Sequence, residues 1–517
     1  MARFYDEIPE YLIEWIKKQH MFWVASAPLS PDGHINVSPK GTADCFHIID
    51  SHRVWYEDLS GSGVETISHV RENRRITILF NAFEGPPRIT RLFGIGTVHE
   101  FGTPEYQALI PAETRNPGSR AAIVIDVYHV GTSCGFAVPL YDFVGQRTQL
   151  LRILDRIECG ARAPGAAKST SAGMKGYWVE NNLRSLDGLP GLVTAPDSTA
   201  PFANNFNRDT PRPTMKNVKP GASGATKISG NMSMHLLLGF FFYHHQTAMA
   251  KFYDEIPEYL IEWIKRQHMF WVASAPLDQN GHINVSPKGT TDCFHVVDSH
   301  RVWYEDLSGS GIETISHLRE NGRITILFNA FEGPPRITRL WGFGTVHEFG
   351  TPEYHALIPA ATRKPGSRAA IVIDVYQVGT SCGFAVPLYD FVAHRTQLLR
   401  SFDLKETCDR VTDAAASTER DEKGLRAYWV RKNLKSLDGL PGLLTAPDCK
   451  ITPTSNFDRD APRPMMKTTK PRGNGVANIS GKTGLLIGFM IGAFVATAVP
   501  RIISSDISRF QFFQSTV

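Results

Sequence analysis

Residues 75–100 read RITILFNAFEGPPRITRLFGIGTVHE, and this stretch decides the fold class. The runs 75–82 and 89–100 are rich in β-branched and aromatic residues, and a Glu-Gly-Pro-Pro turn separates them, so they predict two consecutive strands. Gly94 and Gly96 lie inside the second run. Glycine inside a strand indicates a bend or a close approach of another backbone, as at the corner of a barrel. The stretch therefore predicts bent antiparallel strands.

The sequence on both sides of this stretch continues the pattern. An amphipathic helix opens the chain, with Ile8, Leu12, Trp15 and Ile16 on one face. Further strands are predicted at 21–27, 34–38, 46–49, 54–57 and 121–130, and short helices at 64–72 and 103–110. Roughly six short strands with only small helices between them indicate a mainly β protein, an antiparallel barrel and not a doubly wound sheet.

The whole unit occurs twice. Residues 2–150 recur as residues 250–398 without a gap, and only 19 of the 149 aligned positions differ. A long self-match of this kind indicates two copies of one folding unit, not a solenoid of short repeats. The predicted domains are barrel copy 1 at 1–150, a divergent helical segment and Pro/Gly/Ser-rich linker at 151–249, barrel copy 2 at 250–398, a second divergent segment and linker at 399–481, and an apolar segment at 482–503.

The junction between the copies has two interpretations. Met249-Ala250-Lys251 repeats the start Met1-Ala2-Arg3, as if two reading units had been joined head to tail. A true fusion and a mistaken joining of neighbouring genes both fit this arrangement.

The bulk composition excludes several classes of protein. Apolar residues at 42% and charged residues at 21% are ordinary for a globular protein. A net charge of +4 is too weak to indicate a nucleic-acid partner. The seven cysteines contain no CxxC pair, which argues against a zinc site or a disulfide framework. The N-terminus has no apolar signal stretch, so we expect a protein of the cytoplasmic side that is not secreted.

The C-terminal region contains the apolar run GLLIGFMIGAFVATAV at 484–499. Its sixteen residues fall just short of the ~17–25 that span a bilayer. Gly488 and Gly492 form a GxxxG pair, which suits close helix packing in lipid. The segment 482–503 is therefore interpreted as a transmembrane helix that anchors the chain, with a buried or interfacial helix as the alternative.

The loop Ser60-Gly61-Ser62-Gly63 carries the strongest chemical signal. Glycines allow backbone N–H groups to converge, the hydroxyls add donors, and the N-terminus of the following helix adds positive potential, which together suit a phosphate. The alternative is that a serine of the loop caps the amides of the helix itself. No GxGxxG or GxxxxGK[ST] motif follows a strand here, so Rossmann and P-loop folds are not supported.

Other candidate residues give weaker signals. Lys40 ends a predicted strand in a Ser-Pro-Lys-Gly turn, where it faces either an anion or solvent. Three arginines lie near strands: Arg75, Arg88 and Arg91. At such a place an arginine either pairs with a ligand anion or covers the barrel rim with the aliphatic part of its side chain. Cys134 has no histidine or aspartate partner at a specific spacing, which favours a buried structural thiol over a nucleophile. The histidines lack metal-ligand spacing and are interpreted as structural: His47, His52, His69 and His99.

Three runs together carry a resemblance to a known family. They are GHINVSPKGT at 33–42, YEDLSGSGVETISHVREN at 56–73 and EGPPRITRLFGIGTV at 84–98. In this order and spacing they resemble the pyridoxamine 5′-phosphate oxidase-like family of flavin-binding split barrels. The turn SCGFAVP at 133–139 and the run SLDGLPGL, present at 185–192 and 436–443, are similar to its fungal branch. The resemblance covers about residues 5–192 and 253–443, and it implies two tandem six-stranded antiparallel split β-barrels with short flanking helices.

The resemblance also implies a cofactor, FMN, in a cleft at a two-fold interface between barrels. Ser38 and Lys40 should then meet the flavin ring or its ribityl chain, and Arg75 is a further phosphate candidate. The ribityl–phosphate end should be lined by Tyr56, Asp58, Ser60, Ser62, Gly63 and Thr66. The second copy supplies Ser286, Lys288, Tyr304, Asp306, Ser308, Ser310, Gly311, Thr314 and Arg323. The arginine motif that binds the substrate phosphate in vitamin B6 oxidation is replaced by the divergent segment 151–192, so that activity is not implied.

Two hypotheses about function follow from the resemblance. The first is an FMN-dependent oxidoreductase that acts on a small organic substrate, with catalytic residues unknown and the two copies paired as an intramolecular pseudo-dimer. The second is a protein that binds flavin or another ligand without turnover. Both remain open because the fold alone does not distinguish an enzyme from a binding protein. Bleaching of a yellow protein by NAD(P)H would favour the enzyme.

Overall fold

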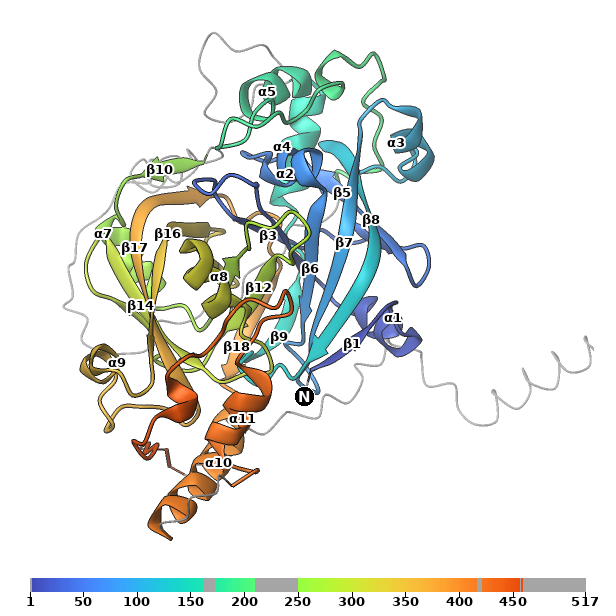
Figure 1. Ribbon diagram of the computed structural model, residues 1–517. Helices are drawn as coiled ribbons and strands as arrows, with labels where there is room; N and C mark the ends of the chain where they lie inside the picture. Colours follow the sequence, from blue (N-terminus) through green and yellow to red (C-terminus); the bar gives the residue numbers. More distant parts are fainter. Residues whose placement is uncertain (1, 161–172, 210–249, 416–420, 456, 459–517) are drawn as a thin grey trace, which may run out of the picture. The chain divides into compact units, whose positions relative to one another are not determined.

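The computed structural model describes residues 2–160, 173–209, 250–415, 421–455 and 457–458 (Figure 1). The first copy contains β1 (Arg3–Tyr5), α1 (Glu10–Ile16), β2 (Phe22–Ser26), β3 (Asn36–Lys40), β4 (Phe46–Ile48), β5 (Arg53–Leu59), α2 (Glu65–Asn73), β6 (Arg75–Asn81), β7 (Ile89–Glu100), α3 (Pro104–Leu109), β8 (Ser119–Ser133), β9 (Leu140–Gly145), α4 (Gln149–Glu158), α5 (Met174–Asn181) and the short 3-10 helix η1 (Ala195–Asp197).

The second copy repeats this order. It contains β10 (Lys251–Tyr253), α7 (Glu258–Ile264), β11 (Phe270–Ser274), β12 (Asn284–Lys288), β13 (Phe294–Val296), β14 (Arg301–Leu307), α8 (Glu313–Asn321), β15 (Arg323–Asn329), β16 (Ile337–Glu348), α9 (Pro352–Leu357), β17 (Ser367–Ser381), β18 (Leu388–Ala393), α10 (Gln397–Ala414), α11 (Leu425–Lys432) and η2 (Ala446–Asp448).

Each copy forms one curled antiparallel sheet, which confirms the mainly β fold with tandem barrels. In the described part of the chain, the first sheet has the order β3-β2-β6-β7-β8-β5-β4, with β1 added alongside β8. The second sheet has the same order. The resemblance implied six strands, whereas each sheet has eight. Seven of the eight overlap the ranges predicted from the sequence, and β1 is the remaining one. β1 was missed because three residues are too few to show an alternating pattern.

The glycine in the deciding stretch does bend the sheet. The register of β7 against β8 shifts between Phe93 and Gly94, which marks a bulge. A Cβ atom at Gly94 would collide with the side chain of Ile125 and lie 2.9 Å from the carbonyl oxygen of Asp126. Glycine at this position therefore lets β8 approach closely, as the sequence predicted.

Strand β2 shows how the two copies pack together. All five of its residues are buried, because its two faces serve different cores. Phe22 and Val24 belong to the core of the first barrel. Trp23 and Ala25 belong to a separate core that contains residues of both copies. At its centre the rings of Trp23 and Trp271 stack with centroids 4.4 Å apart.

Backbone pairing and arginine side chains also join the two copies. Strand β9 pairs with β18 in a two-stranded antiparallel sheet that takes one strand from each copy. Arg147 donates to the carbonyl oxygens of Val386 (2.9 Å) and Gly333 (3.2 Å) in the other copy. Both copies lie within one compact unit.

The described residues that follow each barrel, after 150 in the first copy and after 398 in the second, extend the core of that barrel. Trp178 of α5 has no exposed surface, and its indole N–H donates to Ser60 Oγ at 2.7 Å. In the second copy Trp429 donates to Ser308 Oγ in the same way. Helix α10, with 18 residues, is longer than its counterpart α4, with 10. The divergent segments thus differ in length while they keep the same contact with the barrel.

The predicted membrane anchor falls outside the described residues. The apolar segment 482–503 belongs to the part of the chain that the structure does not describe. Within the described ranges, no helix is both long enough and apolar enough to cross a bilayer.

Candidate functional site

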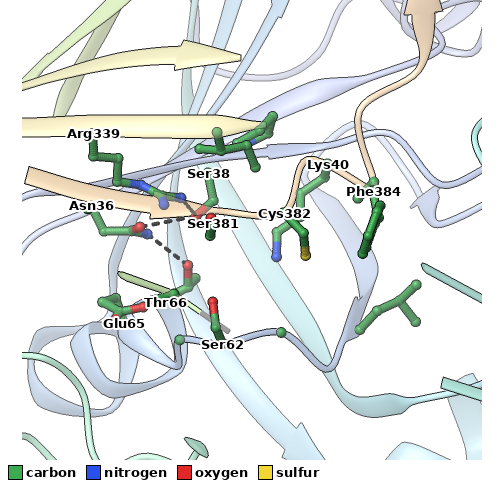
Figure 2. A pocket seen from close by; sticks show the side chains of 18 of the residues that line it. Asn36, Ser38, Lys40, Ser62, Glu65, Thr66, Arg339, Ser381, Cys382 and Phe384 are labelled. Atoms are coloured by element: carbon green, nitrogen blue, oxygen red, sulfur yellow. Dashed lines mark hydrogen bonds between the residues drawn. The ribbon is translucent and has the colours of Figure 1, made fainter. Parts of the chain in front are cut away.

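Two cavities lie where the copies meet, and each is lined by residues of both. The first cavity, built on Lys40, is bordered by β3, the loop 60–63 and the start of α2. The second copy contributes Arg339, Ser381 and Phe384 to its opposite wall, as Figure 2 shows. The second cavity, built on Lys288, has the same construction with the copies exchanged. Each has a volume of about 160 Å³, so the two sites match in size.

The N-terminus of α2 opens into the first cavity without a side-chain cap. Its N-cap residue is Val64, which cannot accept a hydrogen bond from the first turn. In contrast, the N-cap Thr103 of α3 accepts a hydrogen bond from the backbone N–H of Tyr106. The amides at the start of α2 are therefore left for another acceptor. The alternative in which a serine of the loop caps this helix does not hold.

Lys40 is fixed in the cavity by a buried carboxylate. Its Nζ lies 2.6 Å from Asp58 Oδ1, and the other oxygen of Asp58 accepts from Arg120 Nε at 2.8 Å. Burial alone would raise the pKa of Asp58, but Arg120 and Lys40 outweigh it and the pKa is lowered. Two cations share one carboxylate, so this cluster presents a net positive charge to the cavity. Arg120 also donates to the carbonyl oxygen of Gly63 (2.9 Å), which links the cluster to the loop.

Arg339 reaches the first cavity from the second copy. Its Nε donates to the carbonyl oxygen of Val37 at 2.8 Å and its Nη2 donates to Ser38 Oγ at 3.0 Å. Burial lowers the pKa of Arg339, and the negative charge of Glu65 acts in the opposite direction. The matching residue in the second cavity is Arg91, one of the three arginines noted in the sequence.

Most of the residues predicted to bind the cofactor are brought together. Those that line the first cavity are Ser38, Lys40, Ser60, Ser62, Gly63 and Thr66. Those that line the second are Ser286, Lys288, Ser308, Ser310, Gly311 and Thr314. The hydroxyl of Ser60 is already engaged, since it donates to Gly118 O and accepts from Trp178. Ser60 therefore supports the loop by linking it to Gly118 and Trp178.

Three predicted residues of each copy do not line a cavity. Tyr56 is fully buried against Phe22 in the barrel core, and burial raises its pKa well above the usual value. Asp58 lies behind Lys40, as described above. Arg75 donates to the carbonyl oxygens of Pro276 (3.1 Å) and Asp278 (2.6 Å), so it connects the two copies instead of lining the cavity. Tyr304, Asp306 and Arg323 occupy the matching places in the second copy.

The other two candidates from the sequence also have defined places. The guanidinium of Arg88 lies over the rings of Tyr11 and Trp15, 5.4 and 5.3 Å from their centroids. Cys134 is half-buried and lines the second cavity, while Cys382 lines the first. Burial raises the pKa of the Cys382 thiol, which disfavours the reactive thiolate.

Sequence reasoning missed the pair formed by His34 and Asp187. Nδ1 of His34 lies 2.5 Å from Oδ1 of Asp187, and His34 lines the first cavity. His282 and Asp438 form the same pair at 2.5 Å beside the second cavity. A signal was present, because SLDGLPGL is identical at 185–192 and 436–443 although the segments before it diverge. The aspartate of that run is the one that holds the histidine.

Comparisons with known proteins identify the class. The scan against family models finds no match. The chain is 41% identical over 203 residues to the pyridoxamine 5′-phosphate oxidase family protein ustO of Aspergillus flavus, a match that covers 38% of this chain and 80% of that protein. The chain therefore belongs to the pyridoxamine 5′-phosphate oxidase family, whose proteins have a flavin-binding fold.

Solved structures of similar proteins cover one barrel. HupZ of Group A Streptococcus is 19% identical and matches 24% of this chain and 92% of its own, with a TM-score of 0.20. A FAD-binding protein of Mesorhizobium loti is 13% identical and matches 26% of this chain and 97% of its own, with a TM-score of 0.18.

Proposed function

We propose that each cavity binds FMN and that the chain is an FMN-dependent oxidoreductase acting on a small organic substrate. The observation that carries the proposal is the uncapped N-terminus of α2, which shares one cavity with the cation Lys40. A dianionic phosphate needs both amide donors and positive charge, and a helix N-terminus beside a cation offers them together. Family membership supports a flavin as the ligand.

The residues have separate roles in this proposal. Ser62, Gly63 and Thr66, at the loop and the first turn of α2, hold the phosphate end. Ser38 and Lys40 meet the ribityl chain or the ring, and Arg339 of the second copy fixes Ser38. Asp58 acts through the two cations it holds, Lys40 and Arg120, and Tyr56 supports the core behind the cavity. The second cavity uses the matching set, with Arg91 in the place of Arg339.

The chemistry follows from the cofactor and from the charges beside it. A bound flavin supplies the capacity to take up a hydride and two electrons from an organic substrate. The chain positions the substrate and sets the electrostatics. Lys40 is held in one place by Asp58, so its charge is already oriented before any negative charge develops on a ligand.

One feature of the cavity opposes phosphate binding. The carboxylate of Glu65 folds back over Gly63, where an added Cβ atom would collide with it. A carboxylate in the first turn interacts favourably with the helix dipole, but it repels a second anion. The charges of Lys40 and Arg120 offset this repulsion in the proposed complex.

The test is the double variant Lys40→Ala with Lys288→Ala. Losing a charge-assisted hydrogen bond costs about 1.5–3 kcal/mol per cavity, or roughly 10- to 150-fold in Kd. We expect the purified variant to lose its FMN on desalting, as measured by the flavin absorbance per chain. The matched control is Lys17→Ala with Lys265→Ala, because these lysines are exposed and their ion pairs within the described ranges are surface pairs with Glu14 and Glu262. Equal flavin content in both double variants would overturn the proposal.

A second measurement separates an enzyme from a binding protein. FMN-loaded protein is mixed with NADPH or NADH under nitrogen and the flavin band is followed. Bleaching supports the oxidoreductase, and a stable flavin band excludes NADPH and NADH as its electron donors.

A further inference from the structure

A third cavity, the barrel cavity, adjoins the first one at Lys40. It has a volume of about 210 Å³, and all of its lining residues belong to the first copy. Lys40, Thr42 and Cys45 line both this cavity and the first one, so the two spaces are neighbours. The end of α1, the start of β2 and the turn 41–45 form its walls. The proposed function does not require this space.

The floor of the barrel cavity is aromatic. Phe22, Phe46 and Phe80 line it, and the centroids of their rings lie 5.0, 5.1 and 5.7 Å apart. Phe22 and Phe80 are buried members of the barrel core, so the floor is fixed by the packing of the sheet. An apolar cavity of about 150 Å³ is large enough to hold one benzene molecule. The barrel cavity therefore has room for one aromatic ring and a small polar group.

The rim of the barrel cavity is polar and carries a net positive charge. Its charged side chains are those of Lys17, Lys40 and Asp44, two cations and one anion. Lys17 is exposed and paired with Glu14, whereas the side chain of Lys40 is 19% exposed. Small-molecule sites typically combine apolar walls with a few polar groups that fix the orientation of the ligand. The rim therefore favours a ligand whose polar end is an anion close to Lys40.

The second copy differs from the first at this cavity. Three of the sixteen lining positions are substituted, since Ala43, Ile48 and Gln146 correspond to Thr291, Val296 and His394. In the two cavities between the copies, one pair of equivalent lining positions differs. The copies are therefore less alike at the barrel cavity than at the cavities they build together.

His394 bridges the equivalent space in the second copy. Its Nδ1 lies 2.8 Å from the carbonyl oxygen of Gly289, and its ring centroid lies 5.5 Å from that of His268. Gly289 and His268 correspond to Gly41 and His20, which belong to two separate segments of the barrel-cavity lining. The side chain of His394 thus connects two walls that stand apart in the first copy.

Gln146 leaves the two walls of the first copy unconnected. Its amide nitrogen donates to the carbonyl oxygen of His20 at 3.3 Å. Within the described residues it forms no hydrogen bond with the turn 41–45, which is the wall that His394 reaches in the second copy. The exchange of glutamine for histidine therefore separates an open cavity from a bridged one.

We propose that the barrel cavity is a ligand site of the first copy alone and that it binds a small aromatic carboxylate. The ring of the ligand packs on Phe22, Phe46 and Phe80, and its carboxylate lies at the rim beside Lys40. Aromatic rings in such a cup gain from edge-to-face contacts in addition to burial. The site is separate from the proposed FMN sites, and it does not depend on flavin binding.

The test is a calorimetric titration of the full chain with salicylate, a one-ring aromatic carboxylate. It is carried out on the flavin-free chain and again with FMN bound, and we expect one salicylate per chain in both, without release of FMN. Gln146→His should weaken binding about tenfold or more, because the histidine bridges the cavity and displaces contacts with the ligand. The matched control is Gln107→His, the same exchange at an exposed position of α3 whose counterpart is His355.

The reverse exchange is a second test that misfolding does not imitate. His394→Gln with Thr291→Ala gives the second copy the residues of the first, and the count should rise from one salicylate per chain to two. A count that stays at one overturns the inference, as does equal binding by Gln146→His and Gln107→His or a parent chain without saturable binding. Release of FMN by salicylate also overturns it, because the barrel cavity would then be part of the cofactor site. A chain that binds one salicylate but no FMN supports this site and contradicts only the proposed function.

Discussion

The two copies differ at 19 aligned positions, but almost none of these positions line the cavities between the copies. Among the described lining residues, one pair of equivalent positions differs: Trp341 of the second copy borders the first cavity, and Phe93 of the first copy borders the second. The segments after the barrels differ far more, yet both retain the aspartate that holds a cavity histidine. The comparison indicates that the two cavities present the same side chains except at one aromatic wall.

The largest expected effect comes from the core that both copies share. Trp23→Ala removes a fully buried ring that stacks on Trp271, so unfolding should become easier by about 3–5 kcal/mol. Because each cavity has walls from both copies, flavin should be lost from both sites together. Chemical denaturation and flavin content measure the two effects. Loss from the first cavity alone would show that the copies do not depend on this core.

A smaller effect concerns a carboxylate that is paired differently in the two copies. Glu57 accepts hydrogen bonds from Asn116, whereas its counterpart Glu305 forms an ion pair with Lys364 at 3.0 Å. Burial raises the pKa of Glu57 in the folded chain. As the pH rises through that raised pKa, the folded state becomes less stable, because the buried carboxyl group must ionise. Asn116→Lys should favour the carboxylate and stabilise the chain by about 1 kcal/mol at pH 7.

The gain from Asn116→Lys should disappear at acid pH. Below the ordinary pKa of glutamate, about 4.3, Glu57 is protonated in both folded and unfolded chains and the lysine has no charge to pair with. Denaturant unfolding at pH 7 and at about pH 4 measures the difference. The mirror variant Lys364→Asn should lose a similar amount at pH 7, and the same gain at both pH values would exclude an ionic origin.

The smallest effect should come from the one lining position that differs. Trp341→Phe makes the first cavity like the second, and Phe93→Trp does the reverse. Each exchange should change FMN binding by about 0.5–1 kcal/mol, or two- to fivefold in Kd, and in opposite directions. Calorimetry measures the Kd of FMN for the first cavity in the Lys288→Ala background and for the second cavity in the Lys40→Ala background. If the exchanges leave two equal Kd values unchanged, this wall does not distinguish the sites.

The sequence predicted the fold to a large extent. Alternating patterns, turn residues and the self-match located most strands, the short helices and the tandem arrangement, because these features depend on neighbours within a few residues. The loop 60–63 and Lys40 were predicted to serve one site, and they line one cavity. Their role in binding a cofactor stays a prediction.

Contacts between distant parts of the chain were beyond the reach of sequence patterns. Arg75 was interpreted as a phosphate ligand, but its partners are carbonyl groups about 200 residues away. Arg339 enters the first cavity from the other copy, and Asp187 comes from the divergent segment 151–192, which had no predicted place in the site. A single sequence shows which residues can donate or accept, whereas the packing of the two copies decides which groups meet.

The most direct measurement is a titration of the flavin-free full chain with FMN, followed by the quenching of flavin fluorescence. Two paired cavities with the same anion site predict an equivalence point of two FMN per chain, which falls to one in either Lys40→Ala or Lys288→Ala. An unmodified chain that binds no FMN, or a single-lysine variant that still binds two equivalents, would contradict this account.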